Sequence, residues 1–389
     1  MRRRTFLSTL GVASCLAGST APAFPASRLK ADDRLGAALV LSGGGARGAY
    51  QAGVITAQVE ARGIKDGEPF PGIDVVCGAS IGALNGWMVA TAQYTRLTHL
   101  WKTIASVQIF KPKPEYAKIR DVNSGVLTRL GQAMDLGQGL VTDVRGVLDS
   151  APVKSWIDSE VDPGAQLVIP LAFMVTNLTL SASQIFYRPA SVARATAAQR
   201  TIIAEKVRGL TAGAVAREAT DDLLRDALRA SATLPVLFDP VTIDGPNGPE
   251  DFVDGGIANN SPVDVARGVA KNVYCVFLDP DEQPPQQDKN AVAVGLSSLG
   301  IAQHRSIDLA LRSAYVETNL KRELIKSGAL IDAGLLNSIF DVNLYVLHPQ
   351  SELPAKVGDF SNQAALDATF DMGYRAGRSE WSAFRPAYD

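Results

Sequence analysis

Five short apolar segments recur along the chain and have the character of β-strands. They are Ala37–Leu41, Ile73–Cys77, Leu167–Thr176, Val273–Leu278 and Val342–Leu347. Several of them are almost continuously apolar rather than alternating, which is typical of strands buried on both faces of a parallel or mixed sheet. The helix-like segments that separate them are Ala46–Glu60, Ile81–Gln93, Asp221–Ser231, Ser297–Leu336 and Asn362–Trp381. The alternation of strands and helices predicts an α/β layered architecture.

Domain organisation follows from the absence of an internal linker. No stretch after residue 35 has the composition of a linker, so residues 31–389 are predicted to form one domain. Within it, Asp221 is expected to cap its helix and Pro235 to end that region. Two stretches, Lys111–Leu140 and Pro189–Ala216, fit the α/β pattern poorly. Long loops of this kind are either lids and binding segments or solvated surface excursions.

Composition excludes several classes of protein. The formal net charge is -2, so no basic field is available to hold nucleic acid. Cys77 and Cys275 lie in apolar strand-like segments and are expected to be buried free thiols. The three histidines are far apart and show no metal-ligand spacing. No metal site and no cofactor are expected, and the sequence does not decide calcium dependence. The sequence indicates no oligomeric state.

The first thirty residues have the anatomy of an export leader rather than of a folded segment. A positive start, Arg2-Arg3-Arg4, precedes a short apolar region over Phe6–Ala17 and a small-x-small cleavage site at Ala21-Pro22-Ala23. The apolar region is too short to span a bilayer. Arg3-Arg4 and the residues after them also resemble the twin-arginine export motif. Residues 1–30 are therefore interpreted as a signal peptide and tether, and the protein is expected to be periplasmic or envelope-associated.

Two mature N-termini are compatible with this leader. Val12-Ala13-Ser14-Cys15 resembles a lipobox, in which Cys15 would become lipidated and anchor the chain. Cleavage after Ala23 would instead release a soluble protein that begins at Phe24. The sequence leaves both alternatives open.

A run of glycines follows the first predicted strand and opens a helix. Gly43-Gly44-Gly45-Ala46-Arg47-Gly48 satisfies the G-x-G-x-x-G dinucleotide fingerprint, which is a weak signal alone. Glycines let backbone N–H groups approach a ligand closely, and a helix N-terminus stabilises negative charge. A phosphate and a reaction oxyanion are both acceptable occupants of such a loop.

The second predicted strand leads into a nucleophile elbow. Gly78-Ala79-Ser80-Ile81-Gly82 matches G-x-S-x-G and lies between a strand and a helix, which is the context that this motif requires. Ser80 is the candidate nucleophile, and the N–H of Ile81 is expected near a developing oxyanion. An acyl-transfer reaction uses both this elbow and the glycine run, whereas nucleotide binding leaves Ser80 unexplained.

An acidic turn completes the set of candidates. Asp254-Gly255-Gly256 follows the short apolar step Phe252-Val253. An Asp at a strand end can face a cleft, but most Asp-Gly pairs are simple turn residues. Taken alone, this motif favours the turn.

Together the motifs resemble the patatin-like phospholipase family. The resemblance rests on Ser42–Val54, Gly78–Gly82 and Asp254–Gly256 in this order, and it covers roughly residues 36–380. It implies a three-layer α/β/α sandwich with a central mixed, mostly parallel sheet, and hydrolysis of lipid acyl esters at a membrane surface. It also implies a catalytic dyad without histidine, with Ser80 as nucleophile and Asp254 as general base.

The same resemblance assigns supporting roles. It implies an oxyanion hole formed by Gly43, Gly44 and Gly45, in addition to the N–H of Ile81. Arg47 is expected either to support this loop or to meet an anionic headgroup. The remaining motif positions, which are expected to permit the turns around the site, are Gly48, Gly78, Gly82, Gly255 and Gly256.

Three alternatives remain. A Ser–Asp–His triad would use Ser80, Asp254 and then His304 or His348, which is the chain order of the α/β-hydrolases. A non-catalytic lipid-binding envelope protein would retain the fold without turnover. Nucleotide binding through Gly43–Gly48 is the third, although the motif lacks the Lys-Ser/Thr ending of a P-loop.

Overall fold

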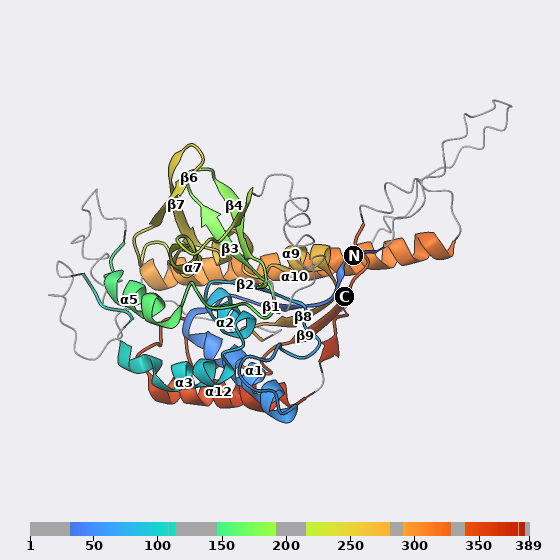
Figure 1. The fold of residues 1–389 in the computed structure, drawn as a ribbon, viewed down its shortest axis with the longest axis horizontal. Coiled ribbons are helices and arrows are strands. Elements are labelled where there is room, and N and C mark those ends of the chain that lie inside the picture. Colours follow the sequence, from blue (N-terminus) through green and yellow to red (C-terminus); the bar gives the residue numbers. More distant parts are fainter. Residues whose placement is uncertain are drawn as a thin grey trace, which may run out of the picture.

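The computed structural model describes residues 32–107, 109–113, 146–191, 215–280, 291–327, 339–379 and 381–385. Within these ranges the chain forms a ten-stranded mixed sheet with helices on both faces (Figure 1). The leader with Cys15, most of Lys111–Leu140 and most of Pro189–Ala216 lie outside the described residues.

The main path of the sheet runs in the order β10-β9-β8-β1-β2-β3-β4-β5, with β7 and β6 joined to it through β3. The five central strands, β9-β8-β1-β2-β3, are mutually parallel. The strands span β1 Leu35–Leu41, β2 Val75–Ala79, β3 Leu171–Asn177, β4 Ala182–Arg188, β5 Val215–Glu218, β6 Val241–Gly245, β7 Gly248–Asp254, β8 Ala270–Val276, β9 Asn343–Leu347 and β10 Ser382–Ala383.

Strand β1 shows why the apolar segments are continuous. Ala37, Leu39 and Leu41 pack into the core on one face of the sheet, while Ala38 and Val40 pack into the core on the other. Because successive side chains of a strand point to opposite faces, a strand covered on both sides must be apolar throughout.

Two groups of helices form the outer layers, as Figure 1 shows. On one face lie α1 (Ala49–Ala61), α2 (Ile81–Ala90), α3 (Tyr94–Thr103) and α12 (Gln363–Gly377). On the other face lie α9 (Val263–Val269) and the long α10 (Ala291–Lys326). The predicted three-layer arrangement is confirmed for the described residues.

Most predicted elements are present, with shifted ends. All five predicted strands form, and the predicted C-terminal helix begins at Gln363 with the side chain of Asn362 accepting the N–H of Ala365 at 3.2 Å. The prediction for Asp221 was wrong. Helix α7 spans Leu224–Ser231, three residues later, and Asp221 instead forms an ion pair with Arg188.

The two cysteines are buried free thiols, as predicted. Cys77 and Cys275 lie on β2 and β8, and both are in register with Val40 of the strand between them. Burial in this apolar layer raises the pKa of the Cys77 thiol to about 12, so the thiol stays protonated.

Candidate active site

Ser80 occupies the sharp turn between β2 and α2. Its backbone has φ 52° and ψ -128°, a conformation that L-residues rarely adopt and that costs about 1–3 kcal/mol. The turn depends on its small neighbours. A Cβ on Gly82 would lie 2.1 Å from the carbonyl oxygen of Leu41, and a Cβ on Gly78 would lie 2.5 Å from that of Gly82. Larger residues at either position would push α2 away from the sheet.

Asp254 reaches the same place by a different route. Strand β3 pairs with β2 as far as Met174, which is opposite Ala79, and its next residue, Val175, is opposite Asp254 of β7. The edge of β3 thus changes partner between two consecutive residues. Ser80 follows Ala79 directly, so this change brings the end of β2 and the end of β7 together.

The two side chains are in direct contact. The Ser80 hydroxyl donates to Oδ2 of Asp254 at 2.5 Å, and Oδ1 of Asp254 accepts the N–H of Gly256 at 2.7 Å. Ser80 is 6% exposed and Asp254 is 1% exposed. Burial raises the pKa of Asp254 to about 6, although the hydrogen bonds from Ser80 and Gly256 act in the opposite direction. Asp254 is therefore a carboxylate at neutral pH, and a stronger base than an exposed one.

The glycine loop passes over the nucleophile. A Cβ on Gly43 would lie 3.0 Å from Cβ of Ser80. The N–H of Gly43 is already bonded to the carbonyl of Asn260 at 3.1 Å, and that of Ala46 to the carbonyl of Val357 at 3.0 Å. Apart from hydrogen bonds within helices and strands, the N–H groups of Gly44, Gly45 and Ile81 donate to no other group among the described residues. The N–H of Gly43 is thus engaged in this conformation, and those of Gly44, Gly45 and Ile81 are the candidates for contact with an oxyanion. The oxyanion hole itself stays a prediction.

Arg47 and Asp279 tie this loop to the sheet. Arg47 forms an ion pair with Asp279, which follows β8, and its Nε donates to the carbonyl of Gly44 at 3.3 Å. These contacts agree with the loop-supporting alternative for Arg47. Asp279 was not predicted from the sequence. The signal that could have found it is its position directly after the strand-like segment Val273–Leu278.

Buried polar side chains of α1 and α2 are hydrogen-bonded to the backbone at both ends of the glycine loop. Gln51 donates to the carbonyl of Ser42 at 2.8 Å, and Asn85 donates to the carbonyl of Gly48 at 3.1 Å and to Oε1 of Gln51 at 3.0 Å. Trp101 donates in turn to Oδ1 of Asn85 at 2.9 Å. Both ends of the glycine loop are thereby fixed to α1 and α2. These buried polar residues were not predicted from the sequence.

Neither His304 nor His348 is hydrogen-bonded to Ser80 or Asp254. Within the described residues, the partner of Oδ2 of Asp254 is Ser80 and that of Oδ1 is Gly256, so no imidazole stands between acid and nucleophile. His348 Nδ1 lies 3.2 Å from the carbonyl oxygen of Pro349. In the part of the chain that the structure describes, no group of three or more His, Cys, Asp and Glu side chains could hold a metal ion.

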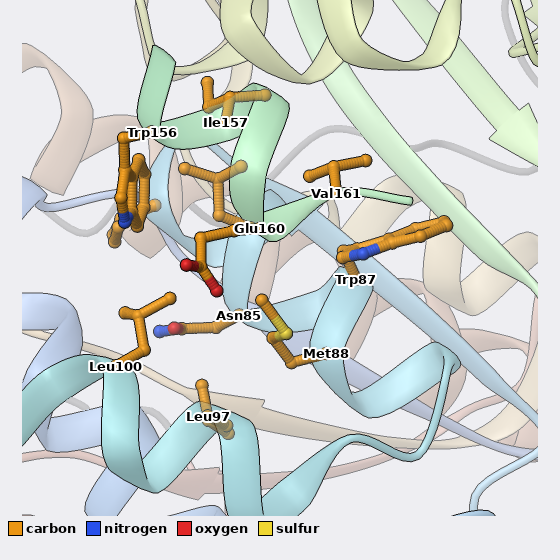
Figure 2. Close-up of a pocket in the computed structure, with 11 residues that line it drawn as sticks. Asn85, Trp87, Met88, Leu97, Leu100, Trp156, Ile157, Glu160 and Val161 are labelled. Atoms are coloured by element: carbon orange, nitrogen blue, oxygen red, sulfur yellow. The ribbon is translucent and has the colours of Figure 1, made fainter. Parts of the chain in front are cut away.

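Figure 2 shows a small cavity lined mostly by apolar side chains of α2, α3 and α5 (Ala151–Glu160). Its volume of about 10 Å³ has room for about one water molecule, so it is a packing gap and not a site for an acyl chain. Two wider surface grooves, one between α3 and α5 and one beside α10, also leave out Ser80 and Asp254.

Comparison with known proteins decides the family. A family model described as patatin-like phospholipase matches residues 39–267, which is more than half of the chain and includes the elbow, the glycine loop and Asp254. The chain belongs to the patatin-like phospholipase family. As a member of that family it is an ester hydrolase that acts on lipid acyl esters. The predicted family, fold class and class of enzyme are confirmed.

Two further comparisons stand beside this match. A solved structure, VipD from Legionella pneumophila, is 14% identical, covers 91% of this chain and 68% of its own, and has a TM-score of 0.33. Comparison with curated proteins gives no match. No helix among the described residues of this patatin-like phospholipase is long and apolar enough to cross a membrane.

Proposed function

We propose that this protein hydrolyses lipid carboxylic esters through an acyl-Ser80 intermediate, with Asp254 as the only general base. One observation carries the proposal, namely the direct 2.5 Å hydrogen bond from the Ser80 hydroxyl to a fully buried carboxylate. A serine becomes a nucleophile when an adjacent base accepts its proton, and here the acid itself stands where a histidine stands in a triad.

In the first half of the reaction, Ser80 Oγ attacks the ester carbonyl carbon and its proton passes to Oδ2 of Asp254. The carbonyl oxygen becomes an oxyanion, which the N–H groups of Gly44, Gly45 and Ile81 stabilise. Each such donor contributes on the order of 3 kcal/mol. The bond to the leaving oxygen then breaks, and the alkoxide takes the proton from Asp254.

The second half returns the enzyme to its starting state. A water molecule gives a proton to Asp254 and attacks the acyl carbon, and the fatty acid leaves as Ser80 Oγ regains the proton. The raised pKa of Asp254, about 6, suits both steps because a base near neutrality accepts and returns a proton readily. The proposed reaction uses no cofactor, and its lipid substrate is presented at a membrane surface.

The test compares wild type with Ser80→Ala and Asp254→Asn on p-nitrophenyl esters and phosphatidylcholine. We expect each variant to stay folded and to lose at least about 10³-fold in kcat. His304→Ala and His348→Ala are the controls and should keep activity within about twofold. Loss of activity in His304→Ala or His348→Ala as large as in Asp254→Asn would replace the dyad by a triad. Retained activity in Asp254→Asn would instead place the general base elsewhere, with His348 the next candidate.

The non-catalytic alternative makes a different prediction. A protein that only binds lipid would show no turnover on this panel, and a fluorophosphonate probe would fail to label Ser80 in the folded wild type. Labelling that disappears in Ser80→Ala would exclude this alternative.

We further propose that the reaction takes place outside the cytoplasm. The support is the basic, short-apolar, small-residue order of residues 1–30. Changing Arg3 and Arg4 to Lys should retain the unprocessed chain in the cytoplasm, as fractionation would show, and Cys15→Ser distinguishes a lipid anchor from cleavage after Ala23. Normal export of the double-Lys variant would remove the twin-arginine part of the proposal.

A further inference from the structure

Ser231 lies beside the gap in the sheet where the nucleophile and the acid meet. It is the last residue of α7 and is completely buried. Its hydroxyl accepts the backbone N–H of Ser80 at 3.0 Å and donates to the carbonyl of Met174 at 2.7 Å. Met174 is the last β3 residue paired with β2. The Ser231 side chain therefore joins the elbow to β3 at the point where the ladder between strands β2 and β3 ends.

The backbone around Ser231 holds the acid. The carbonyl of Ser231 accepts the N–H of Gly255 at 3.1 Å, and the carbonyl of Thr233 accepts the N–H of Asp254 at 2.8 Å. The segment from Ser231 to Thr233, at the end of α7, is thus hydrogen-bonded to the backbone of both Ser80 and Asp254. Ser80 and Asp254 are 174 positions apart in sequence, and Ser231 is the residue that contacts the backbone beside both.

We propose that Ser231 is a positioning residue, whose hydroxyl fixes the strained Ser80 backbone so that Oγ stays in line with Oδ2 of Asp254. The inference rests on the proposed function and adds a residue to its machinery. The Ser231 hydroxyl is hydrogen-bonded to the backbone N–H of Ser80 and not to its Oγ. It acts through the backbone of Ser80.

The chemistry of the position explains why a hydroxyl is required. The site needs one group that accepts an N–H and donates to a C=O, and a serine hydroxyl does both within a small volume. Removing it leaves a buried donor and a buried acceptor without partners, and the elbow can then satisfy them only by moving. A displacement of about 1 Å at a reacting atom can cost about 10²-fold in rate.

The test is Ser231→Ala, assayed on a soluble p-nitrophenyl ester. We expect kcat to fall about 10- to 100-fold while KM stays within about twofold. The acid limb of the kcat profile should also move to higher pH, because weakening the bond from Ser80 raises the pKa of Asp254. In hydrogen-exchange mass spectrometry, the segment over residues 76–82 should lose protection at Ser80.

Thr318→Val is the matched control. The Thr318 hydroxyl is likewise buried, accepting the N–H of Val342 at 3.1 Å and donating to its carbonyl at 3.3 Å, but it joins α10 to the segment before β9. Its loss should lower stability without moving kcat or the acid limb. Ser231→Cys, which fills the same space with a weaker donor and acceptor, should fold and have a kcat between wild type and Ser231→Ala.

Several outcomes would overturn the inference. These are a kcat within twofold of wild type in Ser231→Ala, an equal fall in Thr318→Val, or, if Ser231→Ala does not fold, full kcat in Ser231→Cys. Hydrogen exchange separates this inference from the proposed function. If wild type shows no turnover but Ser231→Ala still loses protection at Ser80, the positioning contact stands and the hydrolytic mechanism falls. Unchanged protection overturns the contact whatever the turnover.

Discussion

The nucleophile and the acid are held by two different kinds of structure. Ser80 belongs to a local unit of strand, turn and helix, in which β2, the elbow and α2 follow one another within sixteen residues, Val75–Ala90. Asp254 belongs to the β6–β7 hairpin, and its position depends on pairing with β3 and on the segment after α7. The backbone conformation of Ser80 is strained, whereas the side chain of Asp254 is buried and lacks full solvation.

The nucleophile side and the acid side of the site therefore carry different unfavourable contributions to the free energy of folding. On the nucleophile side the cost is conformational, and close backbone packing maintains it. On the acid side the cost is electrostatic, because a carboxylate is kept away from water. The two kinds of cost respond to different perturbations, which makes them separable by experiment.

The largest effect is expected from crowding the nucleophile side. In Gly82→Ala the new Cβ would meet the carbonyl oxygen of Leu41 at 2.1 Å, and neither β1 nor α2 can yield without disturbing the core. We expect a loss of about 3 kcal/mol or more in the free energy of unfolding, measured in urea, together with loss of esterase activity.

Gly300→Ala is the matched control for this variant. Gly300 also lies in a helix, α10, but a Cβ there meets nothing within 4 Å. Its replacement should leave stability equal or slightly higher, because alanine favours a helix more than glycine does. A stable and active Gly82→Ala variant would contradict the tightly packed elbow.

The next effect isolates the electrostatic cost on the acid side. The pKa of Asp254 is about 6 in the folded protein, above its ordinary value of 3.8, so folding favours the protonated form. The stability that this group contributes is complete below about pH 3.8 and is lost as the pH rises through about 6. At pH 8, Asp254→Asn should be more stable than wild type by on the order of 2 kcal/mol, and the advantage should shrink toward pH 4.

Urea unfolding at the two pH values measures this difference. Asp244→Asn is the control, because Asp244 lies on the same hairpin and is exposed. As an exposed substitution, it should change the free energy of unfolding by no more than about 0.5 kcal/mol at either pH. If Asp254→Asn were less stable than wild type at pH 8, the carboxylate would be a net stabilising group and the assignment of cost would be reversed.

The smallest effect concerns the tie between the glycine loop and β8. Arg47→Lys keeps a positive charge near Asp279 but loses the hydrogen bond from Nε to Gly44. We expect a fall of about 10-fold in kcat/KM, on neutral p-nitrophenyl esters and on anionic phospholipid alike, because the loop is less well held. A loss confined to the anionic lipid would instead indicate that Arg47 meets the headgroup. Arg312→Lys, in an exposed ion pair of α10, is the control.

The same contrast explains how much of the site was predictable from sequence. The elbow was predicted correctly because its strand, turn and helix are contiguous, and short-range patterns report contiguous structure well. The hairpin strands β6 and β7 were not predicted. The position of Asp254 depends on the register in which β7 pairs with β3, with Asp254 opposite Val175. No local sequence pattern encodes this register.

Contacts between distant segments account for the rest of what was missed. Asp279 and Asn85 carry no motif of their own, and each matters because of what folding places beside it. The expected helix cap at Asp221 was wrong because α7 begins three residues later, at Leu224, and the Asp221 carboxylate pairs with Arg188 of β4. Propensity indicates which residues can cap a helix, but tertiary neighbours decide whether they do.

The change of partner along β3 also bears on how this enzyme can be engineered. Inserting one residue between Met174 and Val175 would displace Asp254 by about 3.3 Å relative to Ser80 and turn the following side chains to the opposite face. The tip of the β6–β7 hairpin, between Gly245 and Gly248, lies at the far end of its ladder from Asp254. Loop grafts and chimeric crossovers belong at that tip, where the length of the chain can vary while the geometry of the reaction is kept.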